Sequence, residues 1–199
     1  MRITITGSHG TGKTTLVQHL LSYLKEQEQK NGFRTELNTE EKIEKIFAGR
    51  LPYRFLPETA VQAYRLGLPI NEYSSIETEV YIFAKQLEME MRYADNWIAD
   101  KCFVDLLAYA QLLFKHDYAL MEILKKIAIP RMHKYDKVIY VPTGEFPIED
   151  DGIRSLDPDF QKEVDTIVVS ILKENRISYQ RIVGDKEERF RAAVKYIQS

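Results

Sequence analysis

Residues 7–14 of the 199-residue chain are Gly7-Ser8-His9-Gly10-Thr11-Gly12-Lys13-Thr14, an arrangement of the form G-x-x-x-x-G-K-[S/T]. The residues before it, Arg2-Ile-Thr-Ile-Thr6, alternate polar and β-branched side chains, which predicts a strand. After Lys13, leucines at 16, 20, 21 and 24 follow helical spacing. Strand, glycine-rich loop and helix therefore come in the order that an anion-binding loop requires.

The residue types in this loop fit a nucleoside triphosphate. Gly7, Gly10 and Gly12 lack a Cβ, so the backbone can take positive φ and approach phosphate groups closely. The helix that follows adds the positive end of its dipole. Lys13 is expected to bridge the β- and γ-phosphates, and the Thr14 hydroxyl to bind Mg²⁺. The predicted nucleotide-binding residues are Gly7, Ser8, His9, Gly10, Thr11, Gly12, Lys13, Thr14 and Thr15.

The composition predicts one soluble domain. Hydrophobic residues make up 44% of the chain, enough for a core, and charged residues make up 29%. The net charge of −2 supplies no overall basic field for nucleic acid. No apolar run has the length of a membrane span, and the strand and loop begin where a signal peptide would lie. We therefore expect a cytoplasmic protein.

Cysteine and histidine usage argues against a metal cluster. Cys102 is the only cysteine, so the chain has no intrachain disulfide, and we expect Cys102 to be a small buried hydrophobe. The four histidines show no ligand spacing. A zinc site is not predicted.

Strand and helix patterns alternate along the rest of the chain, which predicts a parallel sheet with helices on both faces. Ligands bind such sheets at the carboxyl ends of the strands. A loop rich in Gly, Pro and acids is expected over 143–158. Predicted strands cover 33–37, 53–56, 96–99, 138–141 and 178–183; predicted helices cover 13–29, 39–48, 59–66, 75–93, 118–129, 159–174, 186–197 and a stretch from about 104.

Three charged residues follow predicted strands or lie in the long loop. Glu58 is a candidate base for a substrate hydroxyl, or a solvated loop acid. Asp100 is a candidate Mg²⁺ residue, or a turn former at a strand end. Lys101 follows it, so the Asp-Glu pair of water-activating ATPases is missing, which favours transfer to an organic acceptor. Arg154 is a candidate lid arginine that reaches the transferred phosphoryl group.

Taken together, the landmarks are the GSHGTGKTT loop, Leu-Pro-Glu58-Thr-Ala, Asp100-Lys101-x-x-x-Asp105-x-x-Ala108-Tyr109, Tyr135-Asp136-x-Val138-Ile139-Tyr140 and Asp151-Gly152-x-Arg154. Their order resembles the AAA_28-type P-loop kinases, the group that includes the ribosylnicotinamide kinase domain of NadR-like proteins, and is more distantly similar to deoxynucleoside and thymidylate kinases. The resemblance implies a three-layer α/β/α P-loop NTPase fold over 1–199, with a five-stranded parallel sheet ordered 2-3-1-4-5 and a lid at about 143–158.

The resemblance also implies ATP with Mg²⁺ as the phosphoryl donor and a hydroxyl on a nucleoside-like molecule as the acceptor. We therefore expect a kinase that transfers the γ-phosphoryl group to a hydroxyl or phosphate of a nucleoside, nucleotide or related small molecule. The resemblance places the acid that matches Glu58 near the acceptor and the arginine that matches Arg154 in the lid. Together with the loop residues, this gives the hypothesis that Lys13, Glu58, Asp100 and Arg154 are catalytic and that Thr14 and Asp100 position the metal. Related kinases usually carry arginine where this chain has Lys101, which leaves the role of that lysine open. The adenine is expected near Gly184 and Asp185.

The acceptor pocket is expected between the 75–93 helix and the helix after Asp100. Phe83 and Gln86, with Tyr81, are candidates to stack on or read a base, and the alternative is that these side chains fill the core. Asp105 and Tyr109 are spaced one turn apart and either contact the substrate or cap and fill the helix. The candidate acceptor residues are Glu58, Phe83, Gln86, Lys101, Asp105 and Tyr109.

Two other functions stay open at this stage. One is phosphorylation of a nucleic-acid end or a modified base, for which the best basic cluster is Lys125, Lys126, Arg131, His133 and Lys134. The other is a nucleotide-gated switch that binds a partner without acceptor chemistry. The sequence also leaves open whether the chain forms a homodimer.

Overall fold

The computed structural model describes residues 1–30, 53–144, 147, 150 and 152–199. The strand predicted at 33–37 and the helix predicted at 39–48 lie outside these residues.

Five parallel strands form one sheet. They are β1 (Arg2–Thr6), β2 (Arg54–Leu56), β3 (Trp97–Asp100), β4 (Lys137–Tyr140) and β5 (Gln180–Arg181), arranged in the order β2-β3-β1-β4-β5. Ile5 of β1 is in register with Asp100 of β3, and Thr6 with Tyr140 of β4. The residues that follow β1, β3 and β4 therefore meet at one edge of the sheet, and the predicted strand order is confirmed.

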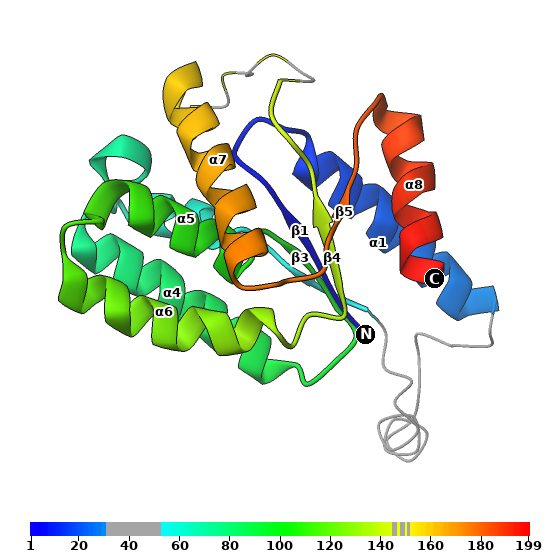
Figure 1. The fold of residues 1–199 in the computed structure, drawn as a ribbon. Helices are drawn as coiled ribbons and strands as arrows, with labels where there is room; N and C mark the ends of the chain where they lie inside the picture. The colour runs from blue at the N-terminus through cyan, green and yellow to red at the C-terminus, as the bar shows by residue number, and fades with distance from the viewer. Residues whose placement is uncertain (31–52, 145–146, 148–149, 151) are drawn as a thin grey trace.

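Helices cover both faces of the sheet (Figure 1). On one face lie α1 (Lys13–Lys30) and α8 (Lys186–Gln198); on the other lie α4 (Ile76–Arg92), α5 (Phe103–Phe114), α6 (Tyr118–Met132) and α7 (Pro158–Glu174). The short helix α3 (Thr59–Arg65) and the 3₁₀ helix η1 (Asn71–Tyr73) connect β2 to α4. Each face has its own apolar core, which confirms the three-layer α/β/α fold. None of the described helices combines the length and apolarity that crossing a bilayer requires.

Two predicted boundaries were wrong. Helix α6 continues through Pro130 to Met132, because Ala128 and Met132 are buried and the His133 amide still donates to the Ile129 carbonyl. The last strand spans only two residues instead of 178–183, although the Ile182 amide adds one more hydrogen bond to Tyr140.

Position 7, directly after β1, requires glycine because the backbone there lies very close to a neighbouring strand end. Its φ is 139°, and a Cβ built on it would lie 2.2 Å from the carbonyl oxygen of Val141, which directly follows β4. A non-glycine residue would therefore have to adopt an unfavourable φ and also push apart two adjacent strand ends.

We expect Gly7→Ala to lower the free energy of unfolding by about 3 kcal/mol, because it adds a backbone clash to an unfavourable φ. Gly67→Ala is the matched control, since Gly67 also has positive φ but a Cβ there would have no neighbour within 4 Å. The control should lose only about 1 kcal/mol. Urea unfolding followed by circular dichroism measures both, and equal losses would contradict the steric explanation.

Candidate active site

The glycine-rich loop connects β1 to α1 and bounds a cavity of about 230 Å³. Gly10 and Gly12 have φ of 68° and 81°, as the loop prediction required. The Lys13 ammonium is buried and donates to the Ser8 carbonyl and, over 3.1 Å, to the Thr11 hydroxyl. Burial and the charge of Lys101 lower the pKa of Lys13 to about 8. Lys13 is therefore still mostly protonated at neutral pH and can meet a phosphate.

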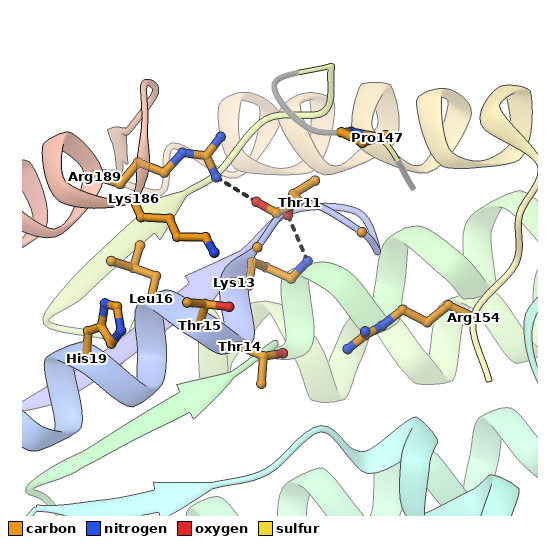
Figure 2. A pocket seen from close by; sticks show the side chains of 12 residues that line it. Thr11, Lys13, Thr14, Thr15, Leu16, His19, Pro147, Arg154, Lys186 and Arg189 are labelled. Carbon is orange, nitrogen blue, oxygen red and sulfur yellow. Dashed lines mark hydrogen bonds between the residues drawn. The ribbon is translucent and has the colours of Figure 1, made fainter. Parts of the chain in front are cut away.

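Residues from both ends of the chain surround this cavity (Figure 2). Lys186 and Arg189 enter from α8, and Arg154 enters from the opposite side. The lining residues are Gly10, Thr11, Gly12, Lys13, Thr14, Thr15, Leu16, His19, Pro147, Arg154, Lys186 and Arg189.

Thr14 and Asp100 lie together, and their oxygens fit Mg²⁺. The Thr14 hydroxyl donates to one carboxylate oxygen of Asp100 over 2.6 Å. The other oxygen, Oδ1, is buried and has no hydrogen-bond partner in the described part of the chain. Hydroxyl and carboxylate oxygens are ligands that Mg²⁺ prefers, and Mg²⁺ usually retains several waters. The β1–β3 register puts Asp100 at the edge where the loop begins.

Asp105 anchors the loop. Of the two alternatives for Asp105, the structure favours helix capping, because both carboxylate oxygens accept from backbone: the Gly7 amide donates to Oδ1 and the Cys102 amide to Oδ2, each over 2.8 Å. Asp105 is fully buried and does not line either of the two cavities at the site. Cys102 is fully buried at the N-cap of α5, as predicted.

His9 connects the glycine-rich loop to α5 and α7. The ring nitrogen Nδ1 lies 2.9 Å from the Tyr109 hydroxyl, and the Gln161 side chain donates to the His9 carbonyl over 2.7 Å. Burial, together with the nearby charges of Lys101 and Lys13, lowers the pKa of His9 to about 3. His9 is therefore neutral and acts here as part of a hydrogen-bonded contact between the loop, α5 and α7.

Arg189 is a residue that the sequence did not reveal. Its guanidinium donates to the Thr11 carbonyl over 2.6 Å and to the Gly184 carbonyl over 2.8 Å. Gly184 and Asp185, predicted near the adenine, do not line the cavity; Asp185 instead caps α8 by accepting from the Glu188 amide. The only sequence signal for Arg189 is its position one turn after that cap.

A second, smaller cavity of about 30 Å³ is lined by the predicted acceptor residues Glu58, Lys101 and Tyr109. Lys101 forms an ion pair with Glu58 at 2.6 Å, and Arg154 donates to the other Glu58 oxygen over 3.2 Å. Burial alone raises the pKa of Glu58, but Lys101 and Arg154 outweigh it and lower this pKa to about 2. The residues that line this second cavity are Glu58, Ala60, Ile70, Asn71, Glu79, Ile82, Lys101, Leu106 and Tyr109.

Lys101 is held in an unusual conformation. Its φ is 71°, a left-handed value that is uncommon for a non-glycine residue. The ammonium lies 4.7 Å from the centroid of the Tyr109 ring, in addition to its ion pair with Glu58. Strained backbone of this kind concentrates at functional sites. The Lys101 side chain therefore contacts both Glu58 and Tyr109.

Glu79, in the first turn of α4, is a second acid in this cavity that the sequence prediction missed. It is 4% exposed and accepts a hydrogen bond from the Ser74 hydroxyl over 2.7 Å. Burial outweighs that hydrogen bond and raises the pKa of Glu79 to about 7. In the sequence, Glu79 was indistinguishable from the acids that commonly begin a helix.

Comparisons with known proteins identify the family and the fold. The family model described as AAA domain, AAA_28, matches residues 2–189. The chain belongs to the AAA_28 family. No protein of curated function matches it.

Three solved structures have folds similar to this chain. A NadR protein in complex with NR has a TM-score of 0.69 at 17% identity, covering 98% of this chain and 49% of that protein; the chain thus spans about half of its length. Thymidylate kinase from Ehrlichia chaffeensis gives 0.61 at 16% identity, covering 100% and 98%. Deoxyadenosine kinase from M. mycoides with bound dATP gives 0.64 at 12% identity, covering both chains fully. These likenesses establish the α/β P-loop NTPase fold.

Of the two alternatives for Phe83 and Gln86, the structure favours core packing, because both side chains are buried and neither lines the cavity that contains Glu58. Phe83 packs against Phe103 with ring centroids 5.6 Å apart, and Gln86 donates to the buried Glu90 over 2.9 Å. Both lie one to two turns further along α4 than Glu79, and α4 leads away from the carboxyl ends of the strands. Tyr81 packs at the edge of the same core.

The basic cluster considered for nucleic acid is partly neutralised by acids. Lys126 pairs with Glu122 at 2.7 Å, and Arg131 pairs with the buried Glu90 at 3.3 Å. Helix α6 runs into β4, so its last turn lies at the amino ends of the strands, away from the glycine-rich loop. This arrangement does not favour a nucleic-acid acceptor.

Folding stability should depend on the protonation of Glu79. Because its pKa is raised from 4.5 to about 7 in the folded state, its stabilising contribution is full below pH 4.5 and is lost as the pH rises through 7. Relative to Glu79→Gln, the wild-type chain should lose about 2 kcal/mol of unfolding free energy between pH 5 and pH 8.

Denaturant unfolding at four pH values measures this difference. Glu163→Gln, which removes an exposed acid from α7, controls for the loss of any carboxyl group. Parallel pH profiles for wild type and Glu79→Gln would contradict the raised pKa.

Proposed function

We propose that this protein is a kinase that transfers the γ-phosphoryl group of ATP, bound with Mg²⁺, to a hydroxyl of a nucleoside-like small molecule. One observation carries the proposal. Arg154 lines the cavity of the glycine-rich loop and also donates to Glu58, which lines the second cavity. One guanidinium group thus contacts both cavities, which supports the proposal because phosphoryl transfer depends on holding donor and acceptor close together next to a positive charge.

The loop residues serve the donor. Backbone amides of the loop and the Lys13 ammonium would surround the phosphates, and Arg154 would neutralise charge on the transferred group. Thr14 and Asp100 would hold Mg²⁺, which, when bound, adds positive charge next to the β- and γ-phosphate oxygens. The aliphatic part of Leu16, with His19 and Lys186 around it, offers a surface on the α8 side for the base.

Glu58 serves the acceptor. With a pKa of about 2 it stays ionised across the physiological range, so it is always able to accept a hydrogen bond from the attacking hydroxyl. Such a carboxylate is a weak base, but phosphoryl transfer depends mainly on positioning and charge stabilisation. Glu58 would orient the hydroxyl and take its proton late in the transfer.

The charges around the second cavity favour an acceptor without a phosphate group. Lys101 is the only cation among the described residues that line it, and Lys101 is already paired with Glu58. Glu79 adds a second acid, so the described residues that line this cavity offer no unpaired cation to a phosphate group on the acceptor. The structurally similar deoxyadenosine kinase is, by its name, a kinase of a nucleoside, which agrees with this choice.

An ATP-consumption screen over nucleosides, nucleoside monophosphates, ribosylnicotinamide and oligonucleotides tests the proposal. We expect turnover with a nucleoside-type acceptor and none with oligonucleotides at any salt concentration. Turnover only with a nucleotide would overturn the choice of acceptor. Tight ATP binding without turnover on any acceptor would instead favour a nucleotide-gated switch.

We expect Lys13→Ala to reduce kcat/KM for ATP by about 1,000-fold or more, because it removes a buried cation next to the phosphates. Steady-state kinetics with the best acceptor measures this effect, and unfolding curves check that the variant is folded. Efficient transfer by a folded Lys13→Ala protein would contradict the whole donor site.

We expect Glu58→Gln to lower kcat by about 100-fold or more, since the amide leaves Lys101 and Arg154 without their carboxylate and orients the hydroxyl poorly. The matched control, Glu163→Gln, should keep wild-type kinetics. Near-normal turnover of Glu58→Gln on the true acceptor would exclude Glu58 as the acceptor-side acid.

A further inference from the structure

The segment that carries Arg154 is attached to the wall of the acceptor-side cavity. The Asn71 side chain, in η1, donates to the Ile153 carbonyl over 2.7 Å. The next residue, Glu72, accepts a hydrogen bond from the Ser155 hydroxyl. Two neighbours in η1 thus hold the residues on both sides of Arg154, which lie more than 80 positions later in the chain.

Asn71 is suited to this contact by its backbone. Its φ is 59°, in the left-handed region that asparagine tolerates better than most residues. Asn71 also lines the cavity that contains Glu58, whereas Arg154 lines the cavity of the glycine-rich loop. The contact therefore joins a wall of one cavity to a charged group of the other.

Ser155 extends the connection into α7. Its hydroxyl oxygen accepts from the Asp157 amide over 3.1 Å while its proton goes to Glu72. Asp157 in turn is the N-cap of α7 and accepts from the Asp159 amide. The backbone of Arg154 is thus fixed between η1 and the first turn of a long helix, so the direction of its guanidinium depends on η1.

We propose that Asn71 and Glu72 form a clamp on Ile153 and Ser155, and that Asn71 is a positioning residue: it aims Arg154 at the transferred phosphoryl group and links the acceptor cavity to that arginine. In its account of turnover the proposal rests on the proposed function. In its account of the clamp itself it does not, because the clamp can be measured without any substrate.

Hydrogen–deuterium exchange tests the clamp directly. Asn71→Gly keeps the left-handed backbone and removes only the side-chain donor, so exchange of the 152–157 peptide should become about tenfold faster. Asn96→Gly is the matched control: Asn96 has a φ of 57° and lies at the other end of the sheet, beside Met1. Exchange of the 152–157 peptide that is unchanged in Asn71→Gly, or equally faster in Asn96→Gly, would overturn the clamp.

Kinetics tests the positioning role. Asn71→Gly should lower kcat about tenfold with little change in the KM for ATP, and it should have less than a twofold effect in an Arg154→Ala background. Equal losses in both backgrounds, or no loss in either, would overturn action through Arg154.

Exchange also separates the two proposals. If the exchange result holds and no acceptor supports turnover, the clamp stands and the kinase assignment falls. If turnover is found but exchange does not change, the clamp falls and the kinase assignment stands.

Discussion

The geometry of the site depends on the buried carboxylate of Asp105. One oxygen accepts from Gly7, the first residue of the loop, and the other accepts from Cys102, the N-cap of α5. A buried ionised acid is unfavourable unless its hydrogen bonds are satisfied, and here two backbone donors supply them. Asp105 therefore ties the end of β1 to the start of the helix after β3. The glycine-rich loop follows β1 and Lys101 follows β3. By binding the backbone after both strands, the Asp105 carboxylate holds the loop and Lys101 at the same site.

Around that anchor, opposite charges are packed away from water. Lys13, Glu58, Asp100 and Lys101 are all less than 10% exposed, and Arg154 contacts Glu58 from the loop before α7. In such an environment each charge needs a partner, so moving one changes the free energy of the others. Phosphate groups would enter this cluster as additional anions. These phosphates would pair with the cations that contact Glu58 and the loop carbonyls, namely Arg154, Lys101 and Lys13. Nucleotide binding would therefore change the charges around Glu58.

Much of the site could be predicted because it is coded locally. The loop spacing around Lys13 fixes a backbone shape, and a parallel sheet brings strand ends to one edge, which is why the sequence could propose Thr14, Asp100 and Glu58 as neighbours of the loop. What the sequence could not give was the depth of each side chain. Asp105 and Tyr109 lie one turn apart on α5, yet the first faces backbone amides and the second a cavity. That difference depends on packing partners from β1 and α7.

The same limit explains why the sequence pointed to Phe83 and Gln86 rather than Glu79 as acceptor candidates on α4, and why it did not reveal Asn71 in η1. On α4, Glu79, Phe83 and Gln86 share one buried face, so helical spacing cannot tell which of them reaches the cavity; only the distance from the strand ends decides. Asn71 could not be found from the sequence for a different reason. Its partner Ile153 is remote in sequence, and Asn71 binds the backbone carbonyl, a group that every residue has. A contact of that kind leaves no side-chain pattern. The residues proposed to select an acceptor and to aim Arg154 are therefore encoded in tertiary contacts, whereas the residues proposed to bind phosphate are encoded in the loop itself.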